Sequence, residues 1–333
     1  PVGPVLAITP FNFPLNLVAH KAAPSMACGN PVIVKPASKT PLTALILGEI
    51  ITEAGWPEGG VSVVPCENAL AEKMVVDERI KKLSFTGSAS VGWRLKGMAG
   101  GKKVTLELGG NAGVIVDEDS DVESAAKRCV AGAFSYAGQI CISVQRIYVH
   151  KNIFERFKET FLENEGALRL GDPLDEETDV GPMIEEAALK RTEAWVKEAV
   201  QEGAMVLAGG MRKGNFFLPT VLTGTRPSMK VCSDEVFAPV TTLEAFDRFE
   251  EAVDRVNSSL YGLQAGIFTN DIKKVFYAFE KLDVGGVIAG DIPTYRADNM
   301  PYGGVKMSGF GREGVRYAIE EMTERKILVL NLS

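Results

Sequence analysis

Short β-branched runs alternate with helix-like segments through the first hundred residues, and this alternation limits the fold more than any other feature. The expected strands cover residues 2–9, 31–35, 61–65 and 81–86, and the expected helices cover 15–27, 41–54, 69–75 and 88–98. Such alternation is typical of βαβ units with parallel strands. Because crossovers between parallel strands are right-handed, the pattern predicts one doubly wound sheet.

The same alternation begins again near residue 104 and predicts a second α/β domain. The runs VTLELGG and AGVIV resemble strands, and the acidic run EDSD suits the N-terminus of a helix over 122–136. Further strands are expected at 146–150, 205–208 and 216–221, with helices at 153–163 and 185–202. We expect domains over 1–109 and 110–309, and a return to the first domain over 310–333. Residues 326–332 alternate weakly, like an edge strand that pairs with another subunit.

Composition excludes several classes of function. A chain of 333 residues exceeds what one core usually supports, which agrees with two domains. The net charge of −7 disfavours nucleic acid and anionic membranes as partners, and no apolar stretch reaches the roughly 18 residues that span a bilayer. The five cysteines are an odd number without a CxxC pair, which favours a reducing cytoplasm. With only two histidines as well, we expect no metal site.

Three side chains stand out as candidates for chemistry. Cys141, in SYAGQICISV, lies between an expected helix and a β-rich segment, although an isolated cysteine is more often a small buried apolar residue. Glu107 interrupts an apolar run, and a buried carboxylate needs partners or a raised pKa; a salt-bridged strand residue is the alternative. Asn12 follows an expected strand at the edge where α/β folds bind ligands, or else forms a turn.

Two further segments suit a phosphate-bearing ligand. FTGSASVG predicts a strand, a glycine turn and a helix whose free N–H groups can receive a phosphate, although the GxGxxG form is missing. Lys35 ends an expected strand in VIVKPAS, and its alternative is a solvated surface lysine.

Together these segments resemble the aldehyde dehydrogenase superfamily, nearest the lactaldehyde and succinate-semialdehyde dehydrogenase group. The strings TPFNFP, VKPAS, FTGS, LELGGN, GQIC, DEVFAPV and PYGGVKMSGFGREG occur in the family's order. The separation of Glu107 from Cys141, 141 − 107 = 34 residues, also matches the family. The superfamily's usual chain has a further N-terminal stretch before the segment that begins here at Pro1, so we expect a fragment, a cleaved product or a short relative.

The resemblance implies a Rossmann-like NAD(P)-binding domain and a catalytic domain, with a C-terminal oligomerisation strand. It implies that Cys141 attacks the aldehyde, and that the Asn12 amide and the Cys141 N–H hold the oxyanion. Glu107 would then activate the water that hydrolyses the thioester. Glu313, in GREG, is a second carboxylate near the same cleft, for which we expect a secondary role in proton relay.

NAD or NADP is the cofactor that the resemblance implies. The matching contact positions are Thr9, Pro10, Lys35, Ser38, Gly87, Ser88, Glu235 and Phe237. Ser38 stands where NAD-preferring relatives often carry a glutamate, so no carboxylate repels a 2′-phosphate and NADP use is expected. Ala238 replaces the family's usual glycine, and we expect only local adjustment.

For the substrate, the resemblance points to Phe13, His20 and Arg296. Arg296 can bind a carboxylate, phosphate or phosphonate, or is a solvated loop arginine; a small hydroxyaldehyde or semialdehyde is expected. A CoA-acylating relative and a non-catalytic fragment are the alternatives to a hydrolytic dehydrogenase. The expected assembly is a homodimer or homotetramer.

Overall fold

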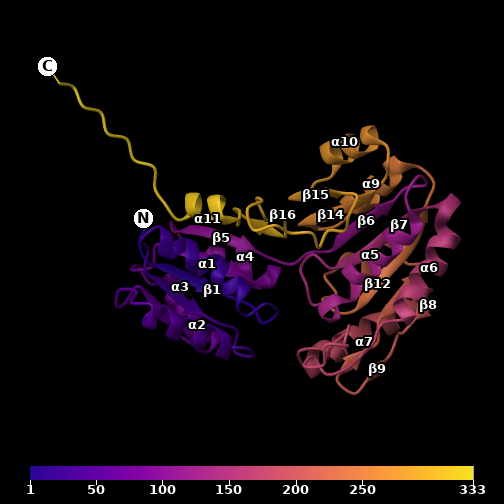
Figure 1. Ribbon diagram of the computed structural model, residues 1–333, viewed down its shortest axis with the longest axis horizontal. Helices are drawn as coiled ribbons and strands as arrows, with labels where there is room; N and C mark the ends of the chain where they lie inside the picture. The colour runs from indigo at the N-terminus through magenta and orange to yellow at the C-terminus, as the bar shows by residue number, and fades with distance from the viewer. Residues whose placement is uncertain (333) are drawn as a thin grey trace. The chain divides into compact units, whose positions relative to one another are not determined.

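The computed structural model describes residues 1–332, which form two compact units (Figure 1). The first unit comprises Pro1–Leu108, Arg296–Gly303 and the chain from Gly309 onward. The second comprises Gly109–Tyr295 and Gly304–Ser308. The change from one unit to the other at Leu108 lies within one residue of the expected boundary.

The first unit contains a six-stranded sheet in the order β17-β5-β4-β1-β2-β3. Its strands are β1 (Val5–Ile8), β2 (Val32–Lys35), β3 (Val61–Val63), β4 (Lys82–Thr86), β5 (Lys103–Glu107) and β17 (Gly309–Phe310). Its helices are α1 (Asn16–Ala27), α2 (Leu42–Glu53), α3 (Asn68–Val76), α4 (Ala89–Met98) and α11 (Val315–Glu321). Strands β1 to β5 pair in parallel, as the alternation predicted, whereas β17 pairs antiparallel with β5.

The strand order reverses between β1 and β4. The chain runs from β1 outward through β2 to β3, and then returns to place β4 on the other side of β1. Neighbouring strands with oppositely directed connections leave a crevice at their carboxyl ends, where open α/β sheets bind ligands. Thr9 and Gly87, which directly follow β1 and β4, therefore lie at the expected ligand-binding edge.

The second unit contains a seven-stranded sheet in the order β15-β14-β6-β7-β12-β11-β8. Its strands are β6 (Ala112–Val116), β7 (Val144–His150), β8 (Met205–Ala208), β11 (Thr220–Thr223), β12 (Val240–Phe246), β14 (Gln264–Phe268) and β15 (Gly286–Ala289). Its longer helices are α5 (Val122–Phe134), α6 (Phe154–Gly166), α7 (Glu186–Gln201), α9 (Phe249–Asn257) and α10 (Ile272–Lys281). Only β8 pairs antiparallel within this sheet.

Three local expectations need correction. The run at 104–107 is β5, which pairs with β4 in the first unit and does not open the second sheet. The strand expected over 216–221 is split into β10 (Phe216–Phe217) and β11 at Pro219, which has no N–H to donate. The segment 296–303, expected in the second domain, belongs to the first unit. Residues 326–332, which we expect to pair with another subunit, form no strand within a single chain, and their side chains are exposed.

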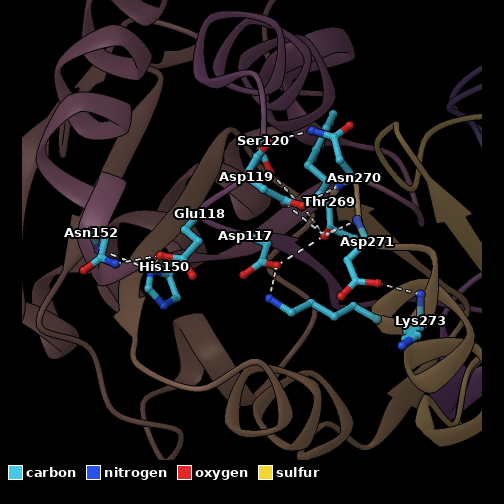
Figure 2. Close-up of polar contacts among 12 residues, drawn as sticks. Asp117, Glu118, Asp119, Ser120, His150, Asn152, Thr269, Asn270, Asp271 and Lys273 are labelled. Carbon is cyan, nitrogen blue, oxygen red and sulfur yellow. Dashed lines mark hydrogen bonds and ion pairs between the residues drawn. The ribbon is translucent and has the colours of Figure 1, made fainter.

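Polar side chains connect the loops at the carboxyl ends of β6 and β14 (Figure 2). The buried Asp117 carboxylate forms an ion pair with Lys274 and accepts a hydrogen bond from the Thr269 hydroxyl at 3.2 Å. Asp119 accepts hydrogen bonds from the Thr269 hydroxyl and from the Asn270 N–H. Asp121 caps α5 through the Ser124 N–H, as expected for the EDSD run. These contacts connect the neighbouring strands β14 and β6 at this edge of the sheet.

None of the helices within residues 1–332 combines the length and the apolar character that a membrane crossing needs.

Candidate active site

A cavity of about 390 Å³ lies at the reversal point of the first sheet. Six of the eight predicted cofactor positions line it: Thr9, Pro10, Lys35, Ser38, Gly87 and Ser88. They come from the ends of β1, β2 and β4 and from the loops that follow. Their convergence from separate parts of the chain provides the polar concave site that a dinucleotide needs.

Positive side chains gather at one end of this cavity. The Lys35 ammonium is buried and donates a hydrogen bond to the Asn68 side-chain oxygen at 3.2 Å. Arg94 also lines the cavity and forms an ion pair with Glu72 at 2.8 Å, and the hydrogen bond from Arg94 lowers the pKa of Glu72. The sequence analysis missed Asn68 and Arg94, because each lies on a helix distant in sequence from the VKPAS motif. Lys35 is not the solvated lysine of the alternative interpretation.

Gly87 and Ser88 form the turn between β4 and α4. A Cβ atom at Gly87 would lie 2.6 Å from the Phe85 ring, so this position has no room for a larger residue. Ser88 is the N-cap of α4 and makes no side-chain capping hydrogen bond. The first N–H groups of a helix lack partners within the helix, and they are suited to bind a phosphate. The turn between β4 and α4 is therefore suited to hold a pyrophosphate group.

Glu107 ends β5 in a fully buried environment. No described residue donates a hydrogen bond to either of its carboxylate oxygens. Burial, reinforced by the negative charge of Glu313, raises the pKa of Glu107 well above its ordinary value of 4.5, against the opposing charges of Lys21 and Arg296. A carboxylate that gains affinity for a proton in this way is suited to act as a general base.

Glu313 forms the centre of a buried charge cluster with Lys21, His20 and Arg296. The Lys21 ammonium lies 2.6 Å from Glu313 Oε1, and both side chains are buried. Burial alone would raise the pKa of Glu313, but the charge of Lys21 and its other cationic neighbours lower it to about 2. Lys21 was not among the predicted site residues. The available signal was a lysine among the apolar residues of the buried face of α1.

Arg296 also belongs to this cluster and is not a solvated loop arginine. Its side chain is 18% exposed, and a guanidinium N–H lies 2.6 Å from His20 Nδ1 and 3.4 Å from Glu313 Oε2. The guanidinium also stacks on Tyr302, 3.9 Å from the ring centre. Asn12 is buried and Phe13 is half-buried directly after β1.

Cys141 lies at the amino end of β7 in the second unit, after three residues in the left-handed region. Tyr136, Ala137 and Gly138 have φ values of 56°, 52° and 65°, so the helix expected to reach 136 ends at Phe134. A Cβ at Gly138 would lie 2.1 Å from the Ala238 carbonyl oxygen. Strained non-glycine backbone often marks a functional segment.

The pair Gly109 and Gly110 has two close neighbours. A Cβ at Gly110 would lie 2.0 Å from the Cys141 carbonyl oxygen, and one at Gly109 would lie 2.2 Å from the Glu235 carboxylate. The Gly110 N–H donates a hydrogen bond to Glu235 Oε1 at 2.9 Å. The two glycines thus allow Cys141 and Glu235 to approach one short backbone segment. Burial raises the pKa of Glu235 to about 7, and the Gly110 hydrogen bond opposes this rise.

Asn111 and Gln145 hold the segment that carries Glu235. The Asn111 amide donates a hydrogen bond to the Cys232 carbonyl at 2.6 Å, and the Gln145 amide donates to the Asp234 carbonyl at 2.7 Å. Gln145 also accepts a hydrogen bond from the Val236 N–H. The next residue, Phe237, has a φ of 51°, again in the left-handed region. The sequence analysis missed the positioning role of both amides.

Comparison with known proteins agrees with this geometry. The family profile described as "Aldehyde dehydrogenase family" matches residues 1–328. The chain is 50% identical to a 3-sulfolactaldehyde dehydrogenase of Priestia aryabhattai over 333 residues, which are 100% of this chain and 70% of that protein.

Two solved structures are also similar. A Physcomitrella patens aldehyde dehydrogenase in complex with the reaction product succinate has a TM-score of 0.97 and 49% identity, covering 99% of this chain and 69% of the other. Glyceraldehyde-3-phosphate dehydrogenase GapN of Methanocaldococcus jannaschii, complexed with NADP, has a TM-score of 0.94 and 44% identity, covering 97% of this chain and 71% of the other.

The contact of Gly110 with Cys141 yields a stability test. Gly110→Ala should lower the free energy of unfolding by about 1–3 kcal/mol, as overpacking does, and slow the reaction of Cys141 with a thiol reagent. Gly166→Ala is the matched control, because its Cβ would meet nothing within 4 Å. Denaturant unfolding and mass-resolved thiol labelling measure both effects. Equal behaviour of the two variants would contradict the tight contact.

Proposed function

This chain belongs to the aldehyde dehydrogenase family, and from this premise we propose that it oxidises an aldehyde to the carboxylic acid through a thioester on Cys141. The observation that carries the proposal is the close packing of the Cys141 carbonyl and the Glu235 carboxylate against Gly109 and Gly110. A nucleophilic residue and a cofactor-binding carboxylate that both pack against one short segment suit a reaction between a bound aldehyde and a nicotinamide.

Cys141 is better suited to nucleophilic chemistry than Cys28, Cys129 and Cys232. Burial raises the pKa of the thiols of Cys28, Cys129 and Cys232 and so disfavours their reactive thiolates. Cys141 is only half-buried, and it follows a strained turn. We assign the attack on the aldehyde carbonyl to Cys141, with the Asn12 amide and the Cys141 N–H as oxyanion donors. Loss of one such donor typically costs about 2.7–4 kcal/mol of transition-state stabilisation.

Glu107 favours hydrolysis over transfer of the acyl group to coenzyme A. When bound, NAD or NADP accepts the hydride that leaves the carbon atom attached to Cys141. Water must then replace the sulfur, and it needs a base. Glu107 is buried with a raised pKa, which supports this role, whereas CoA-acylating relatives often lack a carboxylate at this position. Glu313, joined to Lys21, is the next proton carrier in our proposal.

The cofactor is NAD or NADP, and we propose that NADP is used at least as well as NAD. Lys35 and Ser38 line the cavity that fits the dinucleotide, and neither carries negative charge. A 2′-phosphate can accept hydrogen bonds from an ammonium and a hydroxyl. The nearby Glu72 is already paired with Arg94, which reduces its repulsion of a phosphate.

We propose a small hydroxyaldehyde or semialdehyde with an anionic group as substrate. The Priestia relative is named for a substrate that carries a sulfonate, and the Physcomitrella structure holds succinate. The half-buried Arg296 guanidinium is suited to such a group, and no described residue accepts a hydrogen bond from its Nε. Phe13 and His20 are the other residues that we assign to the substrate side.

The exposed C-terminal residues support an assembly of several copies. Residues 327–330 are all apolar and exposed, with Ile327 at 86%. We propose that this segment adds a strand to another copy in a homodimer or homotetramer. None of the five cysteines, all within residues 1–332, forms a disulfide, which favours a reducing compartment such as the cytoplasm.

Replacement of Glu107 separates the two chemical steps. Glu107→Gln should give one NAD(P)H per active site in a rapid burst and then turn over at least about a hundredfold more slowly, because only the water step needs the base. Cys141→Ala is the control and should give neither burst nor turnover. Stopped-flow absorbance of the reduced cofactor measures both. If Glu107→Gln abolished the burst, Glu107 would instead be assigned to activation of Cys141.

A negative charge at position 38 tests the cofactor assignment. Ser38→Glu should raise the KM for NADP roughly tenfold or more, because repulsion of about 1–4 kcal/mol is expected in a partly solvated cleft. The KM for NAD should be unchanged or lower, since the carboxylate can accept a hydrogen bond from the 2′-hydroxyl. Thr52→Glu, exposed near the carboxyl end of α2 and not part of the cavity lining, is the control. Equal harm to both cofactors would disprove the assignment of Ser38.

A further inference from the structure

His20 lies between a buried carboxylate and an exposed one. Its Nδ1 is 3.6 Å from Glu313 Oε2, and its Nε2 is 3.5 Å from Asp298 Oδ1. The Glu313 side chain is 4% exposed, whereas that of Asp298 is 79% exposed. One imidazole ring therefore connects the interior of the charge cluster with solvent.

Arg296 determines which ring nitrogen of His20 carries the proton. A guanidinium N–H lies 2.6 Å from Nδ1, and arginine can donate hydrogen bonds but cannot accept them. Nδ1 is therefore the acceptor in this arrangement, and the neutral ring carries its proton on Nε2, toward Asp298. In this state Nδ1 is not available to take a proton from Glu313.

Movement of the Arg296 guanidinium away from His20 would make Nδ1 available to accept a proton. An anionic substrate group would attract the guanidinium, whose Nε has no acceptor among the described residues. Nδ1 could then approach Glu313, which now lies slightly beyond hydrogen-bond distance. An imidazole that gains a proton at one nitrogen and releases another from the opposite nitrogen is an effective proton shuttle near neutral pH.

We propose that His20 transfers the proton released in thioester hydrolysis from Glu313 to solvent beside Asp298. Arg296 prevents this transfer while it is bonded to His20 Nδ1, and permits it when its guanidinium moves to bind an anionic substrate. This inference rests on the proposed hydrolytic function. Attack by water forms the new carbon–oxygen bond and breaks the carbon–sulfur bond. The thiolate leaves with the electron pair, and a water proton passes to Glu107. No side chain within residues 1–332 is hydrogen-bonded to the Glu107 oxygens, so in this proposal a water molecule carries the proton from Glu107 to the Lys21 and Glu313 pair. From there a proton passes to His20 Nδ1, while the Nε2 proton leaves to solvent.

The other charged groups near His20 do not provide an equivalent path. Lys21 neighbours it on α1, and Lys82, Arg312 and Glu321 share with it a small cavity of about 10 Å³. That cavity is at the lower limit for one water molecule. Lys82 is fully buried and bonded to Thr105 at 2.7 Å, and Glu321 is 3.3 Å from Lys82. His20 instead also lines a larger cavity of about 360 Å³ together with Asp298.

Chemical rescue tests the proposal. His20→Ala should keep the hydride burst but lower kcat by about 10- to 100-fold in dilute buffer with an anionic aldehyde. Added imidazole should restore kcat saturably, because the larger cavity admits it. The solvent deuterium isotope effect on kcat should rise in the variant and fall on rescue. His20→Gln, which keeps polar contacts but cannot shuttle protons, should stay slow, and Asn16→Ala, which alters another residue lining the cavity, should behave as wild type.

Two results would overturn the relay. One is an unchanged kcat of His20→Ala in dilute buffer. The other is a slow variant with wild-type thermal stability that imidazole does not rescue, since this would show a purely structural role. Loss of acid formation in the wild-type protein, seen by product analysis, would instead overturn the proposed function and the relay with it.

Discussion

The buried ion pair of Lys21 and Glu313 is the interaction around which the first unit is organised. Lys21 comes from α1 and Glu313 from a segment 292 residues later in the chain. Removal of one partner from a buried pair typically costs about 3–5 kcal/mol, because the other charge stays buried without compensation. The pair therefore fastens the C-terminal segment to the first sheet. The pair also affects the electrostatic environment of Glu107, since the negative charge of Glu313 raises the pKa of Glu107.

The second unit depends on close backbone approach rather than on charge. Gly109 and Gly110 lack the side chains that would clash with Glu235 and Cys141, and Gly138 similarly accommodates the Ala238 carbonyl. Asn111 and Gln145 then fix the loop of Glu235 through backbone carbonyls. In the function that we propose, the first unit provides the dinucleotide cavity and the base Glu107, and the second provides the nucleophile Cys141 after a constrained turn.

Local patterns were sufficient to predict most of the parallel strands and the candidate residues. The buried strands are continuous apolar runs, and the motifs around Cys141 and Lys35 are contiguous in sequence. Contacts between residues that are far apart in the sequence could not be predicted from such patterns. The segment 296–303 folds with the first unit because Arg296 and Tyr302 contact Glu313, which no periodicity indicates. The early end of α5 arises from left-handed residues, two of which are not glycine. Residues 326–332 form no strand within a single chain.

The central claim is that burial and the Glu313 charge raise the pKa of Glu107 well above its ordinary value, so that its carboxylate, once ionised, takes a proton from water more readily than an ordinary glutamate would. Infrared difference spectroscopy across a pH titration tests this most directly, with Glu107→Gln assigning the carboxylic acid C=O band. This band should persist well above pH 4.5, the ordinary pKa of a glutamate, and should disappear at lower pH in Glu313→Gln than in the wild type, because the neighbouring negative charge is then absent. A Glu107 carboxyl group that ionises near its ordinary pKa of 4.5, unaffected by Glu313→Gln, would contradict it.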